Sequence, residues 1–591
     1  MKKFKLSGLG LCLALFASDA GAVITTWDPQ GTTGANPYLG NSSGTWESAL
    51  WSTSQTGQAT PGNWVEATAA LFSVHAGFGT PAYTVTMNAN HTVAGIFDGP
   101  LTPNSATVDI TGTGTMFMQS GNLNGFSLRT ATDNSQALVT LDVVIAGGST
   151  AGICAEEGGQ LFLNAANTYG GGSYLGYSGD SFYGIWNFNN SASFGTGFIY
   201  LLNCTGGALA AEGTSPITIP NALVNYQAAA SSLNIVGNAA GVTFSGPWTL
   251  SGGGGGTGAS TYTTTAPLAV YGPVSIGSGG TPGSLVTVSG VISGTNSLTK
   301  FGVGTLALSA ANTFSGALTV NNGTLALTSS GSLNNCPQIF ISTNGVGGSG
   351  TFDVSAYYTY TFGSSTSLKA NGVGASFPAT INGASGGTVN LSSSPIYLNF
   401  SGGAAGDPSS YPLSVAQGLL VFNNNQIIVS NATGTPLGAG TYALIYANNG
   451  CTGTPNSNAG AVLGSGLAAG CTGAIAIDSG DPNQLDLVVT ATTATIPTTT
   501  TITLPAAVPF GTAPVITTTI VPDPSTSPGN SVQFYVNGLL LGGPVTVANG
   551  GIATADSSSL ATLAPGSYTI SALYSGSSDN VYQPSPSGTV T

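Results

Sequence analysis

The sequence has very few charged residues: only 4% of its 591 residues are Asp, Glu, Lys or Arg, against about 25% in ordinary soluble domains. Such a chain cannot stay soluble through a mixed-charge surface, so its many Ser, Thr, Asn and Gly residues must face the solvent instead. Its hydrophobic fraction of 41% is too high for a disordered chain. The composition therefore predicts a folded protein with a polar, mostly uncharged surface.

Basic residues are especially scarce. Of the six Lys and Arg residues, three lie within the first five positions, and only Arg129, Lys300 and Lys369 follow. Binding to a nucleic-acid backbone or to an anionic membrane surface needs clustered Lys and Arg. We therefore expect no nucleic-acid partner for this acidic chain.

The first residues predict export. Three lysines precede an apolar stretch at 6–17, and the small residues Ala20, Gly21 and Ala22 follow, which is the pattern of a secretory signal peptide. We assign the signal peptide to residues 1–22 and cleavage to the bond before Val23. No segment is apolar for the roughly 20 residues that span a bilayer. We expect a mature chain that does not insert into a membrane and is extracellular, cell-surface or periplasmic.

Cysteine is rare as well. The chain has six cysteines, of which Cys12 lies in the signal peptide, and the spacings of the other five do not resemble a zinc site. Cys451 and Cys471 are the nearest pair, and export makes a disulfide between them feasible. The sequence leaves open whether they form it. No residue pattern predicts a cofactor, a metal or a catalytic centre.

Amphipathic helical patterns are lacking after the signal peptide, and short apolar runs alternate with Gly, Asn and Ser, as in chains of many short strands. One run, 304–308 (GTLAL), recurs unchanged at 323–327, and looser copies lie at 114–118, 350–354, 387–391 and 440–444. Alternate side chains of a strand share a face, so Leu306 and Leu308 are expected to point inward and Ala307 outward.

This periodicity predicts an all-β solenoid. About 20 residues would make one three-sided coil, and stacked coils would share a continuous apolar core. A second recurring piece, Ala-Ala-Asn-Thr followed by an aromatic residue, occurs at 165–169 and 310–314. We assign residues 91–490 to a right-handed parallel β-helix.

The segment 295–328 resembles a known family, the autotransporter-associated β-strand repeat, through 297–309, 312–316 and 318–325. The resemblance implies an exported, passenger-like β-helix. The tryptophan-rich stretch 23–90 is similar to the segment that leads into the first coils in such proteins. We interpret it as an N-terminal cap, because a solenoid must cover its exposed end strands, and we expect Trp27, Trp46, Trp51 and Trp64 to form its core.

The C-terminal region has a different pattern. Residues 491–503 are rich in Thr and interrupted by Pro, which is typical of a linker. Residues 504–591 contain several short strand patterns, and the pieces 565–568 and 574–576 resemble the bacterial immunoglobulin-like repeat. This resemblance implies one β-sandwich, in which Tyr568 is either a corner tyrosine or an ordinary core residue.

Parallel β-helices include pectin lyases and polygalacturonases, so an enzyme is an alternative that the residues must support or exclude. Lyases need a basic residue with a calcium site, and hydrolases need clustered carboxylates. Glu156-Glu157 is the only adjacent carboxylate pair, and it is expected to be a solvated turn. Gly383 to Gly387 matches a nucleophile elbow around Ser385 only by chance, since no helix follows.

Two groups of residues are candidates for binding a ligand. His75, His91 and Asp98 could share a metal, although a polar surface role is favoured. The aromatic run 357–362 could stack on sugars if exposed, although core packing is favoured. The favoured function is therefore an exported structural or adhesive protein without catalytic activity, whose partner would be an extracellular glycan or another cell-surface molecule. A glycan-binding module or a polysaccharide-degrading β-helix enzyme is the alternative.

Overall fold

The computed structural model describes residues 24–27, 43–52, 61–72, 82–98, 107–119, 123–128, 138–156, 159–175, 184–201, 205–225, 231–250, 268–271, 285–328, 330–341, 349–456, 462–468, 470–491, 496–578 and 581–591. Two compact units make up the chain: residues 1–319 with 323–336, and residues 320–322 with 337–591. The expected signal peptide lies outside the described residues.

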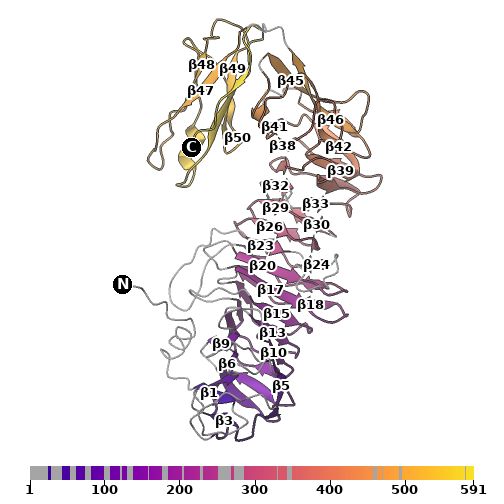
Figure 1. Cartoon of the computed structure of the whole chain (residues 1–591), viewed down its shortest axis with the longest axis vertical. Helices are drawn as coiled ribbons and strands as arrows, with labels where there is room; N and C mark the ends of the chain where they lie inside the picture. Colours follow the sequence, from indigo (N-terminus) through magenta and orange to yellow (C-terminus); the bar gives the residue numbers. More distant parts are fainter. Residues whose placement is uncertain are drawn as a thin grey trace. The chain divides into compact units, whose positions relative to one another are not determined.

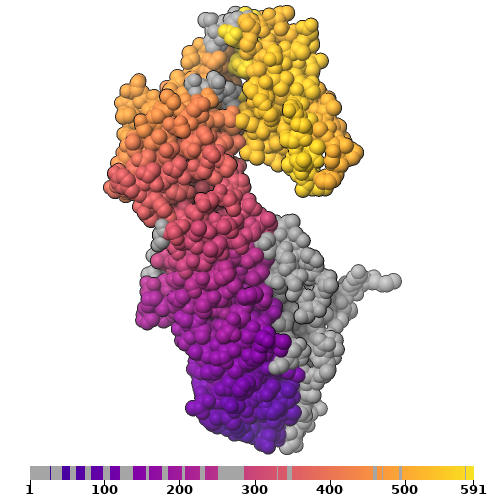
Figure 2. Space-filling view, turned by 180° about the vertical axis from the view of Figure 1, so that it is seen from behind, coloured from indigo at the N-terminus to yellow at the C-terminus, as the bar shows by residue number. Residues whose placement is uncertain are grey.

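The first unit is a stack of coils whose strands form three sheets, and neighbouring coils follow one another in sequence order (Figures 1 and 2). The first sheet has the order β25(Ile292–Ser293), β22(Trp248–Thr249), β19(Leu223–Asn225), β16(Ile199–Leu201), β14(Ser173–Leu175), β12(Gly152–Glu156), β9(Leu123–Leu128), β6(His91–Asp98), β4(Thr68–Phe72), β1(Ile24–Trp27) and β3(Trp51–Ser52). Strand β8(Thr115–Met118) also pairs with β6, and β11(Val144–Ala146) pairs with β8.

The second sheet of this unit has the order β2(Gly44–Thr45), β5(Ala82–Thr86), β7(Thr107–Thr111), β10(Leu138–Leu141), β13(Gln160–Leu163), β15(Ile185–Phe188), β17(Thr205–Ala211), β20(Ser231–Val236), β23(Leu268–Tyr271), β26(Leu298–Phe301) and β29(Leu318–Val320). The third has β18(Ile217–Ile219), β21(Val242–Phe244), β24(Leu285–Val288), β27(Thr305–Leu308) and β30(Gly323–Leu327), and β28(Ala311–Asn312) pairs with β31(Ser332–Leu333).

The two exact repeats stack directly on one another. Strands β27 and β30 are parallel, and Leu306 pairs with Leu325 in a register that continues to Leu308 and Leu327. All four leucines are at most 1% exposed, because they lie on the inner face and pack against the coils above and below. Ala307, expected to point outward, lies on the opposite face but is only 4% exposed.

Coils outside the repeat are longer than the expected 20 residues. In the second sheet Leu138 pairs with Gln160, which pairs with Ile185, so successive coils here take 22 and 25 residues. The extra residues lie in the corners between strands, where the strand register does not constrain loop length.

The asparagines of the Ala-Ala-Asn-Thr pieces bind neighbouring coils together at a corner. Asn167 accepts a hydrogen bond from Ile145 N at 2.8 Å and donates one to Ser193 O at 2.8 Å. Asn312 accepts from Ile292 N at 2.9 Å and donates to Ala310 O at 2.9 Å. Both side chains are 2% exposed. A corner leaves backbone groups without strand partners, and buried backbone groups require hydrogen bonds, which these amides supply.

A lysine occupies a core position of the repeat. Lys300 of β26 is 1% exposed, and its Nζ donates to Phe301 O at 2.7 Å and to Gly302 O at 2.6 Å. Burial lowers the pKa of this amine to about 7, because desolvation disfavours its charged form. The amine therefore satisfies two carbonyl groups at the turn that precedes β27.

The N-terminal region has an aromatic core. Trp46 and Trp51 lie 4.7 Å apart between ring centroids, Trp51 and Trp64 also 4.7 Å, and Trp27 and Trp51 5.0 Å. All four are at most 9% exposed, so the expected tryptophan core is present. Strands of this region already pair in parallel with the coils, as β4 does with β6 and β5 with β7.

The second unit begins with more coils. Parallel strands form the orders β32(Gln338–Ile341), β35(Ser367–Ala370), β38(Ile396–Phe400), β41(Ile427–Asn431), β44(Val462–Gly464), and β34(Thr359–Thr361), β37(Thr388–Asn390), β40(Leu419–Asn423), β43(Cys451–Thr454). A third set runs β33(Gly350–Asp353), β36(Ala379–Asn382), β39(Leu413–Gln417), β42(Gly440–Ala447), β46(Gln484–Ala491), β45(Cys471–Ile477). The last two strands are antiparallel to each other, and β46 is antiparallel to β42.

Two small antiparallel sheets follow in the same unit. One has the order β47(Thr499–Thr503), β48(Thr517–Val521), β51(Ile552–Thr554), and the other β50(Leu539–Thr546), β49(Ser531–Val536), β52(Ile570–Tyr574), β53(Ser585–Pro586), with a short 3₁₀ helix at Ser558–Thr562. Their inner faces share a core that includes Ile520, Phe534 and Tyr574. Strand β47 occupies the last residues of the segment expected to be a linker.

Outward positions of this sandwich are also buried. Tyr535 and Leu573 lie on the face opposite to that core, yet they are 1% and 6% exposed, and they form a cluster with Ile428 of β41. The sequence signal is a loss of alternation: Ile427 to Val429 and Phe534 to Val536 are continuous apolar runs, as in strands covered on both faces.

The all-β prediction with a parallel β-helix is confirmed. Among the residues that the structure describes, no helix is long or apolar enough to cross a membrane. The immunoglobulin-like class of the C-terminal sandwich stays a prediction, although Tyr568 Oη donates to Ala564 O at 2.7 Å, which is the kind of contact that a corner tyrosine makes.

Candidate functional site

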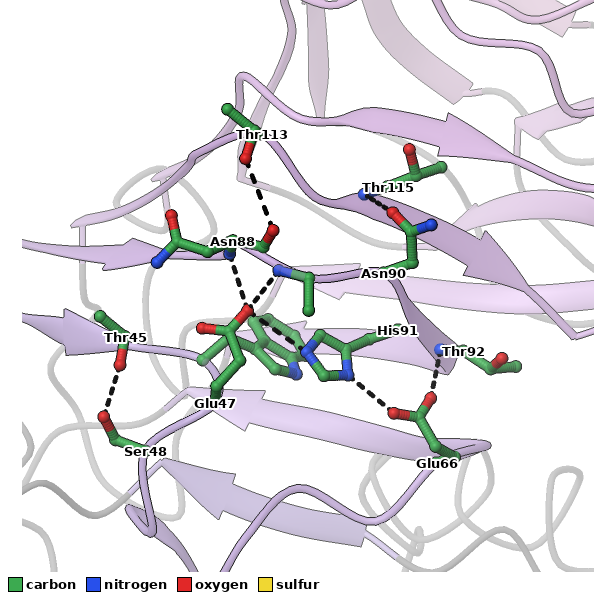
Figure 3. A network of polar contacts seen from close by, with 12 residues as sticks. Thr45, Glu47, Ser48, Glu66, Asn88, Asn90, His91, Thr92, Thr113 and Thr115 are labelled. Atoms are coloured by element: carbon green, nitrogen blue, oxygen red, sulfur yellow. Dashed lines mark hydrogen bonds and ion pairs between the residues drawn. The ribbon is translucent and has the colours of Figure 1, made fainter.

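One polar network in the first unit is centred on His91 (Figure 3). Its Nδ1 lies 2.7 Å from Glu66 Oε1, and its Nε2 lies 3.4 Å from Glu47 Oε1. Glu47 Oε1 also accepts the backbone N–H groups of Asn88 at 2.7 Å and Ala89 at 2.6 Å. The His91 side chain is 11% exposed. Three chain segments therefore meet at one imidazole ring.

This network is suited to holding the fold rather than to chemistry. The His91 ring stacks on Trp46 at 6.1 Å between centroids, so the network rests on the tryptophan core. Burial opposes ionisation of Glu47, but the backbone hydrogen bonds and His91 together hold its pKa below the ordinary value. The described side chains that contact the imidazole are Glu47, Glu66 and Trp46, and none of them is a hydroxyl or thiol nucleophile.

The metal site considered for His75, His91 and Asp98 is not formed by the described residues. His75 and the side chain of Asp98 lie outside them, and His91 is held by two glutamates instead. Within the described ranges, no three His, Cys, Asp or Glu side chains are grouped so that they could hold a metal ion.

The two cysteines considered for a disulfide are both buried. Cys451 of β43 and Cys471 of β45 are free thiols in the structure, so the bridge between them is not formed there. Cys451 Sγ contacts Asn483 O at 3.7 Å. Burial, with a smaller contribution from Asp481 and Asp486, raises the pKa of the Cys451 thiol to about 12, which makes it a poor nucleophile.

The remaining sequence candidates do not form a site. Glu157 and the side chain of Glu156 lie outside the described residues. Ser385 lies in the turn between β36 and β37, and β37 rather than a helix follows it, which agrees with a chance match to the nucleophile elbow.

Carboxylates gather instead in a hollow of about 550 Å³ on the second unit. We call it the Asp486 hollow. Its lining residues come from the loop before β39, from β42 and from the β45–β46 hairpin: Gly406, Asp407, Pro408, Thr441, Ala476, Ile477, Asp478, Ser479, Asp481, Gln484, Asp486 and Val488. On the outer face, Asp486 pairs with Ala443 on one side and Ala476 on the other. These small neighbours leave space around the carboxylate.

The hollow contains a buried polar pair. Gln484 is 6% exposed and Asp486 1%, and Gln484 Nε2 donates to Asp486 Oδ1 at 2.7 Å. Burial raises the pKa of Asp486 to about 6; the bond from Gln484 opposes this shift, and Asp478 and Asp481 add to it. Strongly shifted carboxyl groups in a hollow are typical of functional sites.

Two stacked tyrosines stand next to this pair. Tyr411 and Tyr446 lie 5.4 Å apart between centroids with an interplanar angle of 18°, and both are partly exposed. Tyr446 is the cross-strand partner of Gln484, and directly paired residues of antiparallel strands share a face. The tyrosine pair therefore lies on the same outer face as the Gln484–Asp486 pair.

Two other groups of aromatic side chains lie elsewhere in the described residues. In the run 357–362, Phe362 is buried, Tyr358 is 71% exposed, and Tyr360 packs edge-on against Phe352 and Phe362. Core packing therefore holds for part of the run only. In the first unit, Tyr174 and Tyr200 stack at 4.6 Å and 20°, and Tyr200 packs edge-on against Phe198.

Sequence reasoning missed the Asp486 hollow. The carboxylates are separated by up to 79 positions, between Asp407 and Asp486, and only the antiparallel hairpin and the loop before β39 bring them together. The available signal was the segment 478–486, which contains three of the few acidic residues of the chain.

Comparison with known proteins agrees with the repeat architecture. The family model described as the passenger-associated-transport-repeat matches residues 298–327, which include strands β26 to β30. The chain therefore carries an autotransporter-associated repeat within its parallel β-helix.

The chain is also similar to the adhesin BmaC autotransporter of Brucella suis biovar 1 (strain 1330), at 30% identity over 183 residues. The aligned part is 31% of this chain and 5% of that relative, so the chain spans a small fraction of the length of the relative it matches. No solved structure matches the chain.

Proposed function

We propose that this protein is an exported, surface-displayed adhesive protein without catalytic activity. The observation that carries the proposal is the passenger-associated repeat at 298–327, which forms coils of a parallel β-helix in direct register. Partial similarity to an autotransporter adhesin supports the adhesive role. A stack of coils presents a long, repetitive polar face, and many weak contacts along such a face add up when several are made together.

Attachment of beads tests the adhesive role. Beads coated with the full chain should attach to a glycan-bearing surface such as immobilised mucin, and attachment should rise steeply with coating density because the contacts are multivalent. Albumin-coated beads are the control. If the coated beads do not attach at any density, the adhesive role is wrong.

Display and absence of catalysis need separate assays. Antibody labelling of intact cells should detect the chain, whereas a periplasmic location would require permeabilised cells. A panel of acidic and neutral polysaccharides should release neither reducing ends nor unsaturated products. Robust turnover of any of them would replace the proposal with the β-helix enzyme alternative.

A further inference from the structure

The Asp486 hollow has hydrogen-bonding capacity that the chain itself does not use. Gln484 Nε2 donates to Asp486 Oδ1, but no described residue donates to Gln484 Oε1 or to Asp486 Oδ2. Both side chains are more than nine-tenths buried and line the hollow. These two oxygens can therefore accept hydrogen bonds from a molecule that enters the hollow.

The charge of the hollow selects against anions. Asp407, Asp478 and Asp481 line it together with Asp486, and its described lining includes no Lys, Arg or His. A hollow lined by one sign of charge concentrates ligands of the opposite sign. An ammonium group would supply both the positive charge and the missing hydrogen-bond donors.

The stacked tyrosines add an apolar contact beside these acceptors. Tyr446 pairs with Gln484 across β42 and β46 and stacks on Tyr411. Aromatic rings bind flat apolar faces such as the C–H face of a sugar ring, and they attract cations. One ligand class satisfies all three features, because it combines a ring face, hydroxyl donors and a positive charge.

We propose that the Asp486 hollow binds a saccharide that bears amino groups, with Gln484 and Asp486 accepting hydrogen bonds from it and Tyr446 contacting a sugar ring. The inference deepens the proposed function by naming the chemical class that the protein would attach to, and it rests on that function for its biological role. Binding itself is measurable on the purified full chain.

Calorimetry with three soluble trisaccharides tests the ligand class. Triglucosamine carries amino groups, cellotriose is neutral and trigalacturonate is anionic. We expect triglucosamine to bind at least about tenfold more tightly than cellotriose, because each tenfold step corresponds to one charge-assisted contact of ordinary strength. Trigalacturonate should not bind. Equal or tighter binding of trigalacturonate would overturn the proposal, and so would a lack of binding by triglucosamine.

Amino-acid substitutions test whether triglucosamine binds at the Asp486 hollow. Gln484→Met, which keeps the side-chain length and removes the acceptor, and Tyr446→Ala should each weaken triglucosamine binding by about tenfold. Tyr200→Ala is the matched control, since it removes one member of a stacked tyrosine pair in the first unit and should leave affinity unchanged. Circular dichroism of each variant separates loss of the site from loss of the fold, and Tyr411→Ala provides a second probe of the pair. Equal effects of the variants at Tyr446 and Tyr200 would contradict this location.

Three further outcomes are decisive. Binding that requires Ca²⁺ and disappears with a chelator would overturn the proposal by making the carboxylates a metal site. If Gln484→Met abolishes saccharide binding while coated beads still attach to mucin, the hollow binds sugars but adhesion uses another surface. If the beads never attach although triglucosamine binds, the adhesive role fails and the binding site stands.

Discussion

The repeat coils and the hairpin of β45 and β46 both bury an ionisable side chain, but they differ in how its hydrogen bonds are used. Lys300, with its pKa lowered to about 7, donates to two carbonyl groups of the adjoining turn. Asp486, with its pKa raised to about 6, has one described partner, Gln484. Lys300 thus completes the hydrogen bonding of the backbone, whereas Asp486 keeps an acceptor that faces a hollow.

The largest loss of stability is expected when Lys300 is removed. Lys300→Ala should destabilise the repeat coils by about 2–4 kcal/mol, because it leaves a cavity and two unsatisfied carbonyl groups. Hydrogen exchange of the β27 and β30 amides measures this locally, which matters because stacked coils need not unfold in one step. Lys369→Ala is the control: Lys369 lies over the Phe340 ring at 4.8 Å, and its loss should matter by less than about 1 kcal/mol. Equal effects would contradict a special role for Lys300.

The pH dependence of the same coils gives the second effect. The pKa of Lys300 is lower in the folded chain than its ordinary value of 10.5, so the unfolded state binds more protons between about pH 7 and pH 10. Stability should therefore rise with pH, by about 2 kcal/mol between pH 7 and pH 9. Thermal melts at pH 7, 8 and 9 measure the slope, which Lys300→Met should abolish. A slope that persists in this variant would assign it to another group.

A third prediction concerns the buried side-chain amide of Asn312, which is hydrogen-bonded to the backbone. Asn312→Ala should destabilise the corner between β27 and β29 by about 1–3 kcal/mol, because Ile292 N loses its acceptor in the interior. Asn335 makes one exposed bond of 3.2 Å to Thr313 O, and Asn335→Ala should have an effect below about 0.5 kcal/mol. Hydrogen exchange at Ile292 distinguishes the two variants, and unchanged protection there would show that the amide bond is dispensable.

At the hairpin of β45 and β46, by contrast, removing the buried charge is predicted to increase stability. The pKa of Asp486 is raised above 3.8 to about 6 in the folded chain, so the folded state binds more protons in that window and stability should fall as pH rises from about 4 to 6. Asp486→Asn keeps an acceptor for Gln484 and removes the buried charge. It should stabilise the second unit by about 1–2 kcal/mol at pH 7 and flatten this slope. Denaturant titrations at pH 4 and pH 7 test it; destabilisation would indicate a structural carboxylate.

Much of the fold could be predicted because the repeat makes local and tertiary patterns coincide. The leucines of the two exact copies stack in register, and the four tryptophans form one core, since a run of large apolar groups in a polar chain has few other places to pack. Asn167 and Asn312 also recur in the sequence, although their bonds to Ile145 and Ile292 became evident only from the structure.

The candidate site could not be predicted because no periodicity marks it. The Asp486 hollow depends on an antiparallel hairpin that departs from the parallel pattern and on a loop from an earlier coil. The burial of Tyr535 and Ile428 likewise requires tertiary packing, and strand β47 begins at Thr499 because its Thr residues pair with β48 rather than remain in a linker.

The smallest expected effect extends the comparison to a partly exposed polar network. Glu66 contacts His91 Nδ1 at 2.7 Å, but its side chain is 54% exposed, so water can replace much of the contact. Glu66→Gln should therefore lower the stability of the N-terminal region by only about 0.5–1 kcal/mol. His91→Leu should have a larger effect, because it also leaves Glu47 without its imidazole partner above the Trp46 ring. Tryptophan fluorescence during denaturant unfolding reports on this region, since the ring of Trp46 stacks on His91. If Glu66→Gln destabilised the region as much as Lys300→Ala destabilises the repeat coils, burial would not be what separates structural polar groups from exposed ones.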